Sequence, residues 1–151
     1  MIYVDTSALA KAYLTEARSH EVDEMLARES GSVVIGELAI LEMRCAISRR
    51  TRDQTLVADI AARIWATFQS DVADGHFEMI QHHPDDFQAA TRLIEMIAPL
   101  PVKALDALHL VFARRSGASQ FASADRQQLA AAEALGLQTI SFVPVNISPV
   151  Q

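Results

Sequence analysis

The chain has 151 residues, of which half are hydrophobic and 21% are charged. A chain of this length can bury one sizeable core and is too short for two ordinary domains, so we expect residues 1–151 to form one domain. Cys45 is the only cysteine, which excludes an intrachain disulfide and a zinc site built on thiolates. There is no long uncharged apolar run and no secretory leader pattern, so we expect a cytoplasmic protein that does not enter a membrane.

The formal net charge of -6 argues against nucleic-acid binding, because affinity for phosphates comes largely from Lys and Arg. Four acidic residues discussed below are candidate metal ligands. Setting them aside lowers the count of Asp and Glu from 19 to 15, against 13 Lys and Arg. Arginines also cluster at 44–52 and 114–126, where they can form positive rims, although a solvated helix face explains any single arginine equally well.

Short apolar runs alternate with helical patterns along the chain, which predicts repeated strand–helix units. The expected strands cover residues 2–4, 32–35, 77–81, 120–123 and 137–142. The expected helices cover residues 7–14, a short segment capped by Ser19, residues 37–50, a long segment from a Thr51–Gln54 capping box to about residue 71, a segment with Pro84 in its first turn, and residues 102–116 and 126–135. Such units imply right-handed crossovers, and we expect an α/β fold, a three-layer α/β/α sandwich with a mostly parallel central sheet.

Ligands of such sheets bind at the carboxyl ends of the strands, near the point where strand order reverses. Asp5 and Asp125 each follow a predicted strand and are therefore candidates for a site there. Both also suit a helix N-cap: Asp5 precedes Thr6, and Asp125 has a glutamine three residues on, as in a capping box. Ser123 can either orient a ligand or serve as a turn residue.

Glu42 lies on a predicted helix, and its neighbours at spacings of three and four are all apolar or small. A carboxylate on such a face is partly desolvated, so it needs a cation, a hydrogen-bonding partner or a raised pKa. The alternative is a salt bridge to a distant arginine or a position at the edge of a groove.

Asp106 lies on a strongly apolar helix, in which we expect Leu105, Leu108 and Phe112 to face the core. Asp106 and His109 are one turn apart and share a face. The alternative to a metal ligand is therefore an Asp–His pair at the surface. We expect His109 itself to pack or to support the site rather than to bind the ion, because hard cations prefer oxygen.

Together the four acids form a pattern with a chemical use. Carboxylates crowded at one end of a sheet repel one another, and a divalent cation relieves that repulsion. Mg²⁺ or Mn²⁺ held by carboxylate oxygens lowers the pKa of a bound water and orients it for attack on a phosphodiester. The pattern indicates a metal-dependent enzyme acting on phosphodiesters.

Four segments of the chain resemble the PIN domain, and more narrowly the VapC-type toxins of bacterial toxin–antitoxin pairs. They are Ile-Tyr-Val-Asp5-Thr6-Ser7, Leu-Ala-Ile-Leu-Glu42-Met-Arg, Leu-Asp106-Ala-Leu-His109-Leu and Ser123-Ala-Asp125-Arg-Gln-Gln-Leu. They occur in the family's order, and the resemblance spans Met1 to about Val143. At position 123 relatives often have threonine, and serine keeps the hydroxyl.

The resemblance implies a Mg²⁺- or Mn²⁺-dependent endoribonuclease, the toxin of a type II toxin–antitoxin system, that cuts a structured RNA such as tRNA or rRNA. It implies that the metal is held by Asp5, Glu42, Asp106 and Asp125, with Thr6 and Ser123 as supporting hydroxyls. It also implies a homodimer and a VapB-type antitoxin whose C-terminal tail lies in the active-site groove.

Three other functions are weighed against this one. A haloacid-dehalogenase-like phosphatase needs a second acid two residues after the first, and that position is Ser7. A receiver-like module needs an aspartate after a central strand and a lysine after a later one, but the strand at 32–35 ends at Gly36-Glu37 and Lys103 lies on a predicted helix. A non-catalytic PIN fold that only binds RNA or protein is separated from a nuclease by an activity measurement.

Overall fold

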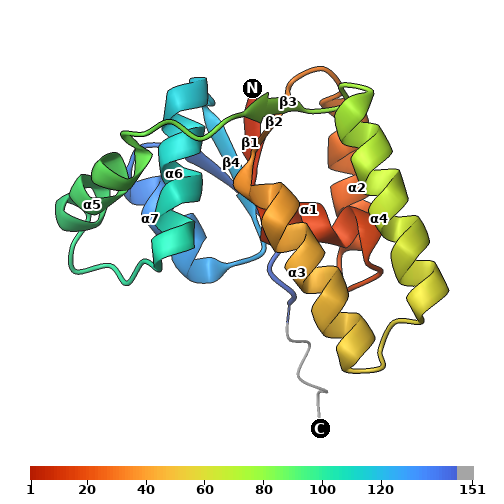
Figure 1. Ribbon diagram of the computed structural model, residues 1–151. Helices are drawn as coiled ribbons and strands as arrows, with labels where there is room; N and C mark the ends of the chain where they lie inside the picture. Colours follow the sequence, from red (N-terminus) through yellow and green to blue (C-terminus); the bar gives the residue numbers. More distant parts are fainter. Residues whose placement is uncertain (146–151) are drawn as a thin grey trace, which may run out of the picture.

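The computed structural model describes residues 1–145, in which short parallel strands alternate with helices (Figure 1). The strands are β1 (Ile2–Val4), β2 (Val33–Gly36), β3 (Glu78–Ile80), β4 (Gln120–Ser123) and β5 (Gln138–Ser141). The helices are α1 (Thr6–Tyr13), α2 (Ser19–Arg28), α3 (Leu38–Arg52), α4 (Ala58–Ala73), α5 (Asp86–Met96), α6 (Ala104–Ser116) and α7 (Arg126–Ala134). Within this part of the chain, no helix is both long enough and apolar enough to cross a bilayer.

The strands form one sheet in the order β3-β2-β1-β4-β5, and each of its four strand pairings is parallel. The predicted sandwich is confirmed, and the sheet of the described residues is wholly rather than mostly parallel. From β1 the chain first builds outward through β2 and β3, then returns to the other side of β1 for β4 and β5. The order therefore reverses between β1 and β4, and a ligand site is expected at their carboxyl ends.

Alternate residues of the central strand feed the two cores. Ile2 and Val4 pack with side chains of α1 to α4 on one face, whereas Tyr3 packs with α5, α6 and α7 on the other. Figure 1 shows these two groups of helices on opposite sides of the sheet. Burial on both faces explains why the runs at β1 and β2 are almost continuously apolar.

Two capping predictions are wrong. The Thr51–Gln54 box does not open a helix, because α3 continues through Arg52 and α4 begins only at Ala58. Thr51 stays helical, with its hydroxyl donating to the carbonyl of Ile47 one turn back, a bond that competes with capping. Ser19 is the first residue of α2 rather than its N-cap, and its hydroxyl accepts the N–H of Glu16.

Leu105 was expected in the core but is 46% exposed. It lies in the first turn of α6 and borders a surface groove described below. Leu108 and Phe112 are buried as predicted. The start of α6 therefore leaves the core and reaches the site.

Gly36 ends β2 against two buried aromatic rings. A Cβ added to it would lie 2.3 Å from Cδ2 of Phe112 and 2.5 Å from the hydroxyl oxygen of Tyr3. Both rings are buried and cannot move freely, so we expect Gly36→Ala to lower the free energy of unfolding by about 1–3 kcal/mol. Urea denaturation measures this. Combining Gly36→Ala with Phe112→Leu should recover part of the lost free energy of unfolding. Unchanged stability of the single variant Gly36→Ala would contradict the close contact.

Candidate functional site

Asp5 lies at the carboxyl end of β1 and caps α1. Its carboxylate accepts the N–H of Ala8 at 2.9 Å and the hydroxyls of Ser7 at 2.8 Å and Ser123 at 2.7 Å. The N-cap interpretation is thus confirmed, and the side chain is 1% exposed. Burial raises the pKa of this carboxyl, although His109 and the hydrogen bonds oppose the rise.

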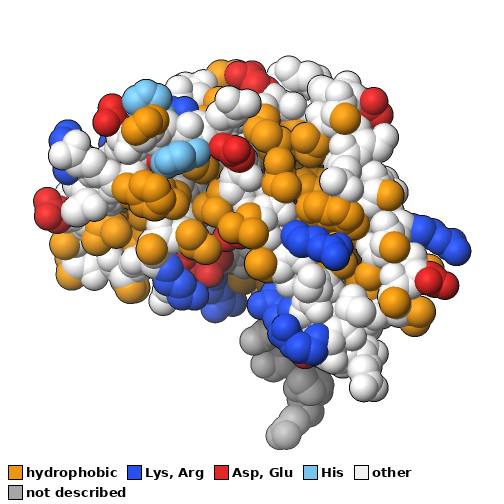
Figure 2. Space-filling view, viewed as in Figure 1, with side chains coloured by type: hydrophobic (Ala, Val, Ile, Leu, Met, Phe, Trp, Pro, Cys, Tyr) orange, Lys and Arg blue, Asp and Glu red, His pale blue; other side chains and the backbone are white. Residues whose placement is uncertain are grey.

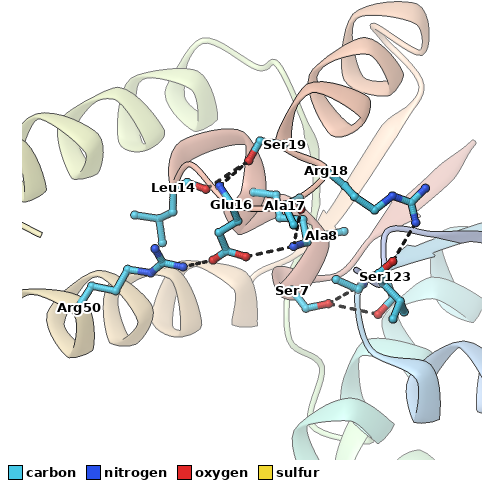
Figure 3. Close-up of polar contacts among 12 residues, drawn as sticks. Ser7, Ala8, Leu14, Glu16, Ala17, Arg18, Ser19, Arg50 and Ser123 are labelled. Carbon is cyan, nitrogen blue, oxygen red and sulfur yellow. Dashed lines mark hydrogen bonds and ion pairs between the residues drawn. The ribbon is translucent and has the colours of Figure 1, made fainter. Parts of the chain in front are cut away.

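Two serines join the ends of β1 and β4. The hydroxyls of Ser7 and Ser123 lie 3.2 Å apart (Figure 3). Each of them also bonds to Asp5. Ser7 accepts the N–H of Ala124, and Ser123 accepts that of Asp125, both at 2.9 Å. Ser123 therefore orients Asp5 and also shapes the turn after β4, so its prediction as a turn residue is confirmed, whereas its part in orienting a ligand stays a prediction.

Asp125 caps α7 at the adjacent strand end. Its carboxylate accepts the N–H groups of Gln127 at 2.7 Å and Gln128 at 3.1 Å. The N-cap prediction is confirmed, but the full capping box is not, because the Gln128 amide donates to the carbonyl of Asp106 instead. The positive ends of α1 and α7 therefore both point toward this end of the sheet.

Asp106 is half-buried in the first turn of α6 and faces the other acids. Its pKa is raised by burial, then by repulsion from Asp125 and, more weakly, from Glu42. The pair with His109 that was weighed as the alternative is not formed, because both ring nitrogens of His109 have other partners. Asp106 is thus a carboxylate held near two like charges.

Glu42 reaches the site from α3. Its Oε2 lies 2.6 Å from Nε2 of His109 and also accepts the hydroxyl of Thr6. Burial raises the pKa of this carboxyl, but the bonds from His109 and Thr6 outweigh it and leave the pKa below its usual value. The partner of Glu42 is therefore a histidine and a threonine, not the distant arginine weighed from the sequence.

His109 connects Glu42 to the centre of the sheet. Its Nδ1 lies 2.7 Å from the hydroxyl of Tyr3, and both side chains are buried. Because a carboxylate can only accept, we assign the Nε2 proton to the bond with Glu42 and let Nδ1 accept from Tyr3. The supporting role of His109 agrees with the sequence expectation, whereas Tyr3 was missed; its one signal was a hydroxyl in the middle of a buried strand.

Asp5 and Asp125 lie just after β1 and β4, and Asp106 is close enough to Asp125 and Glu42 to be repelled by both, but the four acids do not form a complete metal-binding set. Among residues 1–145, no three His, Cys, Asp or Glu side chains are arranged to hold one ion. Asp5, Glu42 and Asp125 are each bonded to donors of the protein, as described above. The donor chemistry still fits a hard cation, because the candidate ligands are carboxylate oxygens. Burial raises the pKa of Asp5, and burial together with repulsion from Asp125 and Glu42 raises that of Asp106.

A groove of about 620 Å³ opens beside the site between α1 and α3. Glu42, Thr6 and Ser7 lie at one end, and the side chains of Leu41 and Leu105 border it. In Figure 2, acidic side chains near the lower edge, between α6 and α3, have Lys and Arg side chains on either side. A chain of linked phosphates can therefore approach the acids along a partly basic surface.

The fold is shared with several solved structures. VapC20 of Mycobacterium tuberculosis, a sarcin-ricin loop cleaving toxin, superposes with a TM-score of 0.68 at 20% identity, covering 87% of this chain and 95% of its own. VapBC2 of Rickettsia felis, bound to a DNA fragment from its promoter, gives 0.65 at 15% identity, covering 94% and 99%. FitAcB of Neisseria gonorrhoeae gives 0.68 at 13% identity, covering 93% and 96%.

Among proteins of curated function, none matches the chain in sequence. The family model of the PIN domain, in contrast, matches residues 2–135, a span that includes the four acids and both serines of the site. The chain belongs to the PIN-domain family.

Proposed function

We propose that this protein is a metal-dependent endoribonuclease in which Asp5, Glu42, Asp106 and Asp125 hold Mg²⁺ or Mn²⁺. The observation that supports the proposal is the placement of Asp5 and Asp125 just after β1 and β4, where strand order reverses, with Asp5 buried and Asp106 close enough to Asp125 and Glu42 to be repelled by both. Membership of the PIN family and the likeness to VapC20, which cleaves the sarcin-ricin loop, support RNA as the substrate.

The chain's own residues would prepare the site for a phosphodiester. Ser123 and Ser7 fix the carboxylate of Asp5, and Thr6 and His109 fix that of Glu42. The N-termini of α1 and α7 direct partial positive charge to the place where a phosphate would sit. The cation, when bound, would activate a water molecule and neutralise charge on the phosphate oxygens.

As to biological role, we propose a type II toxin that acts in the cytoplasm as a homodimer and is blocked by a VapB-type antitoxin. The likeness to the VapBC2 and FitAcB structures supports this role. Incubating the purified protein with cellular RNA and sequencing the new ends would identify the target, with tRNA or rRNA expected. An RNA pool left uncut in Mg²⁺ and in Mn²⁺ would contradict the proposal.

A non-catalytic PIN fold that binds RNA or protein is the second candidate. It is favoured by the engagement of Asp5, Glu42 and Asp125 with donors of the protein itself. Metal binding separates the two functions, because a module that only binds has no need of the ion.

Metal binding is expected to stabilise the fold by mass action. At a concentration of Mg²⁺ or Mn²⁺ about 100 times Kd, the gain is about 2.7 kcal/mol, which raises Tm by several degrees. Asp106→Asn should lose most of this shift, whereas Asp23→Asn, an exposed change on α2, should keep it. Thermal scans with and without metal measure both. A wild-type Tm that millimolar metal leaves unchanged would argue against the metal site.

A further inference from the structure

The groove between α1 and α3 has an acidic end and a basic end. Glu42 lies at the first, and Lys11, Arg49 and Arg50 line the second. Arg49 and Arg50 follow Glu42 by seven and eight residues on α3, which places them about 10–12 Å further along the helix axis. An anionic group bound at the basic end would therefore not be the group that is attacked at the acids, but a neighbouring group of the same molecule.

The basic end is held together by one carboxylate. Lys11 Nζ donates to Oε2 of Glu16 and to the carbonyl of Ala17, both at 3.0 Å, and Arg50 bonds to the other oxygen of Glu16. Figure 3 shows Arg50 on α3 directed at Glu16 in the loop after α1. One carboxylate thus pairs with two cations, and Arg49 adds a third positive charge to the lining, so the basic end carries an excess of positive charge.

The environment of Lys11 reflects this excess of positive charge within the groove. It is only 4% exposed, so its ammonium has little contact with water. Burial, followed by repulsion from Arg18 and Arg50, lowers its pKa. An anion entering the groove would replace lost hydration and relieve that repulsion.

We infer that Lys11, Arg49 and Arg50 bind a backbone phosphate of the RNA strand, a short way along the strand from the bond that is cut. The inference rests on the proposed function, since it assumes that the acids mark the cutting site. Guanidinium groups suit phosphate because two N–H donors can meet two of its oxygens. Such contacts fix the register of the strand without reading its bases, so sequence choice would arise elsewhere.

Arg49 offers the sharpest test because it is exposed, whereas Arg50 supports the loop through Glu16. Binding of a short fluorescein-labelled single-stranded RNA is measured by anisotropy in EDTA over a series of salt concentrations. For a single strand, each lost phosphate contact lowers the slope of log K against log salt by about 0.7 in magnitude. We expect Arg49→Gln to show this decrease.

Arg52→Gln is the matched control. Arg52 lies on the same helix as Arg49, and its substitution changes the charge equally. Its side chain, however, is 73% exposed, has its Nε 3.8 Å from Oδ1 of Asp53 and does not line the groove. Its slope should match the wild type. Glu16→Gln should act in the opposite direction and tighten RNA binding, because it removes the one negative charge among the cations, whereas a merely structural role predicts no gain.

Equal slopes for Arg49→Gln and Arg52→Gln would overturn the inference, and so would weaker RNA binding by Glu16→Gln at unchanged thermal stability. Poly-glutamate serves as a second probe. If binding of poly-glutamate depends on Arg49 and binding of RNA does not, the groove binds an acidic peptide and the inference is wrong. Since these measurements follow binding without metal, they can fail while cleavage by the wild type still supports a nuclease.

Discussion

Asp5→Asn is expected to lower the rate of RNA cleavage by about a thousandfold or more while the fold remains intact. The side chain would keep its shape but lose the charge that we assign to metal binding, and losses of this size accompany removal of one electrostatic group from an active site. Cleavage of a labelled RNA in Mg²⁺ measures the effect.

The fold should tolerate this change for two reasons. Asparagine caps helices as well as aspartate does, so its oxygen can accept the N–H of Ala8 and its amide can donate to Ser123. Burial already disfavours the charged form of Asp5, so a neutral side chain adds no desolvation cost. Circular dichroism should show stability within about 1 kcal/mol of the wild type. Asp23→Asn is the control. If Asp5→Asn cleaved RNA as fast as this control does, the result would contradict the role of Asp5.

His109→Leu is expected to have the largest effect on stability. It would leave the buried hydroxyl of Tyr3 and the carboxylate of Glu42 without their shared partner, at a cost of about 2–5 kcal/mol in the free energy of unfolding. Urea denaturation measures this cost. A loss below 1 kcal/mol would show that the network contributes little.

His109→Gln and His109→Asn separate positioning from stability. An amide in glutamine can reach the place of Nε2 and keep a donor to Glu42, whereas asparagine reaches only the place of Nδ1, toward Tyr3. If His109 positions Glu42, the glutamine variant should retain a higher kcat than the asparagine variant at similar stability and similar KM. Equal kcat values would leave His109 with a structural role only.

The architecture and the location of the site could be predicted from the sequence because both depend on local order along the chain. Each apolar run followed by a helical pattern is a strand–helix unit, and a parallel sheet of such units brings the residues after β1 and β4 together. Asp5 and Asp125 were found in this way. Helix ends were less predictable: the side chains of Thr51 and Ser19 suit a cap, but each found a backbone partner in the preceding turn.

The contacts within the site could not be predicted, because they join distant segments. Tyr3 and His109 are 106 residues apart, and Glu42 and His109 are 67 apart. The sequence shows that Glu42 needs a partner but not which helix supplies it. The basic end of the groove was hidden for the same reason, since Lys11 and Arg50 meet only through Glu16.

The most direct test of the central claim measures metal binding and cleavage on the same purified protein. Isothermal titration with Mn²⁺ and cleavage of cellular RNA are followed for the wild type and for Asp106→Asn, before and after EDTA treatment. We predict that the wild type binds Mn²⁺, loses cleavage in EDTA and regains it when metal returns, and that Asp106→Asn is deficient in both properties. Cleavage that persists in EDTA, or a wild type that binds no Mn²⁺, would contradict the account.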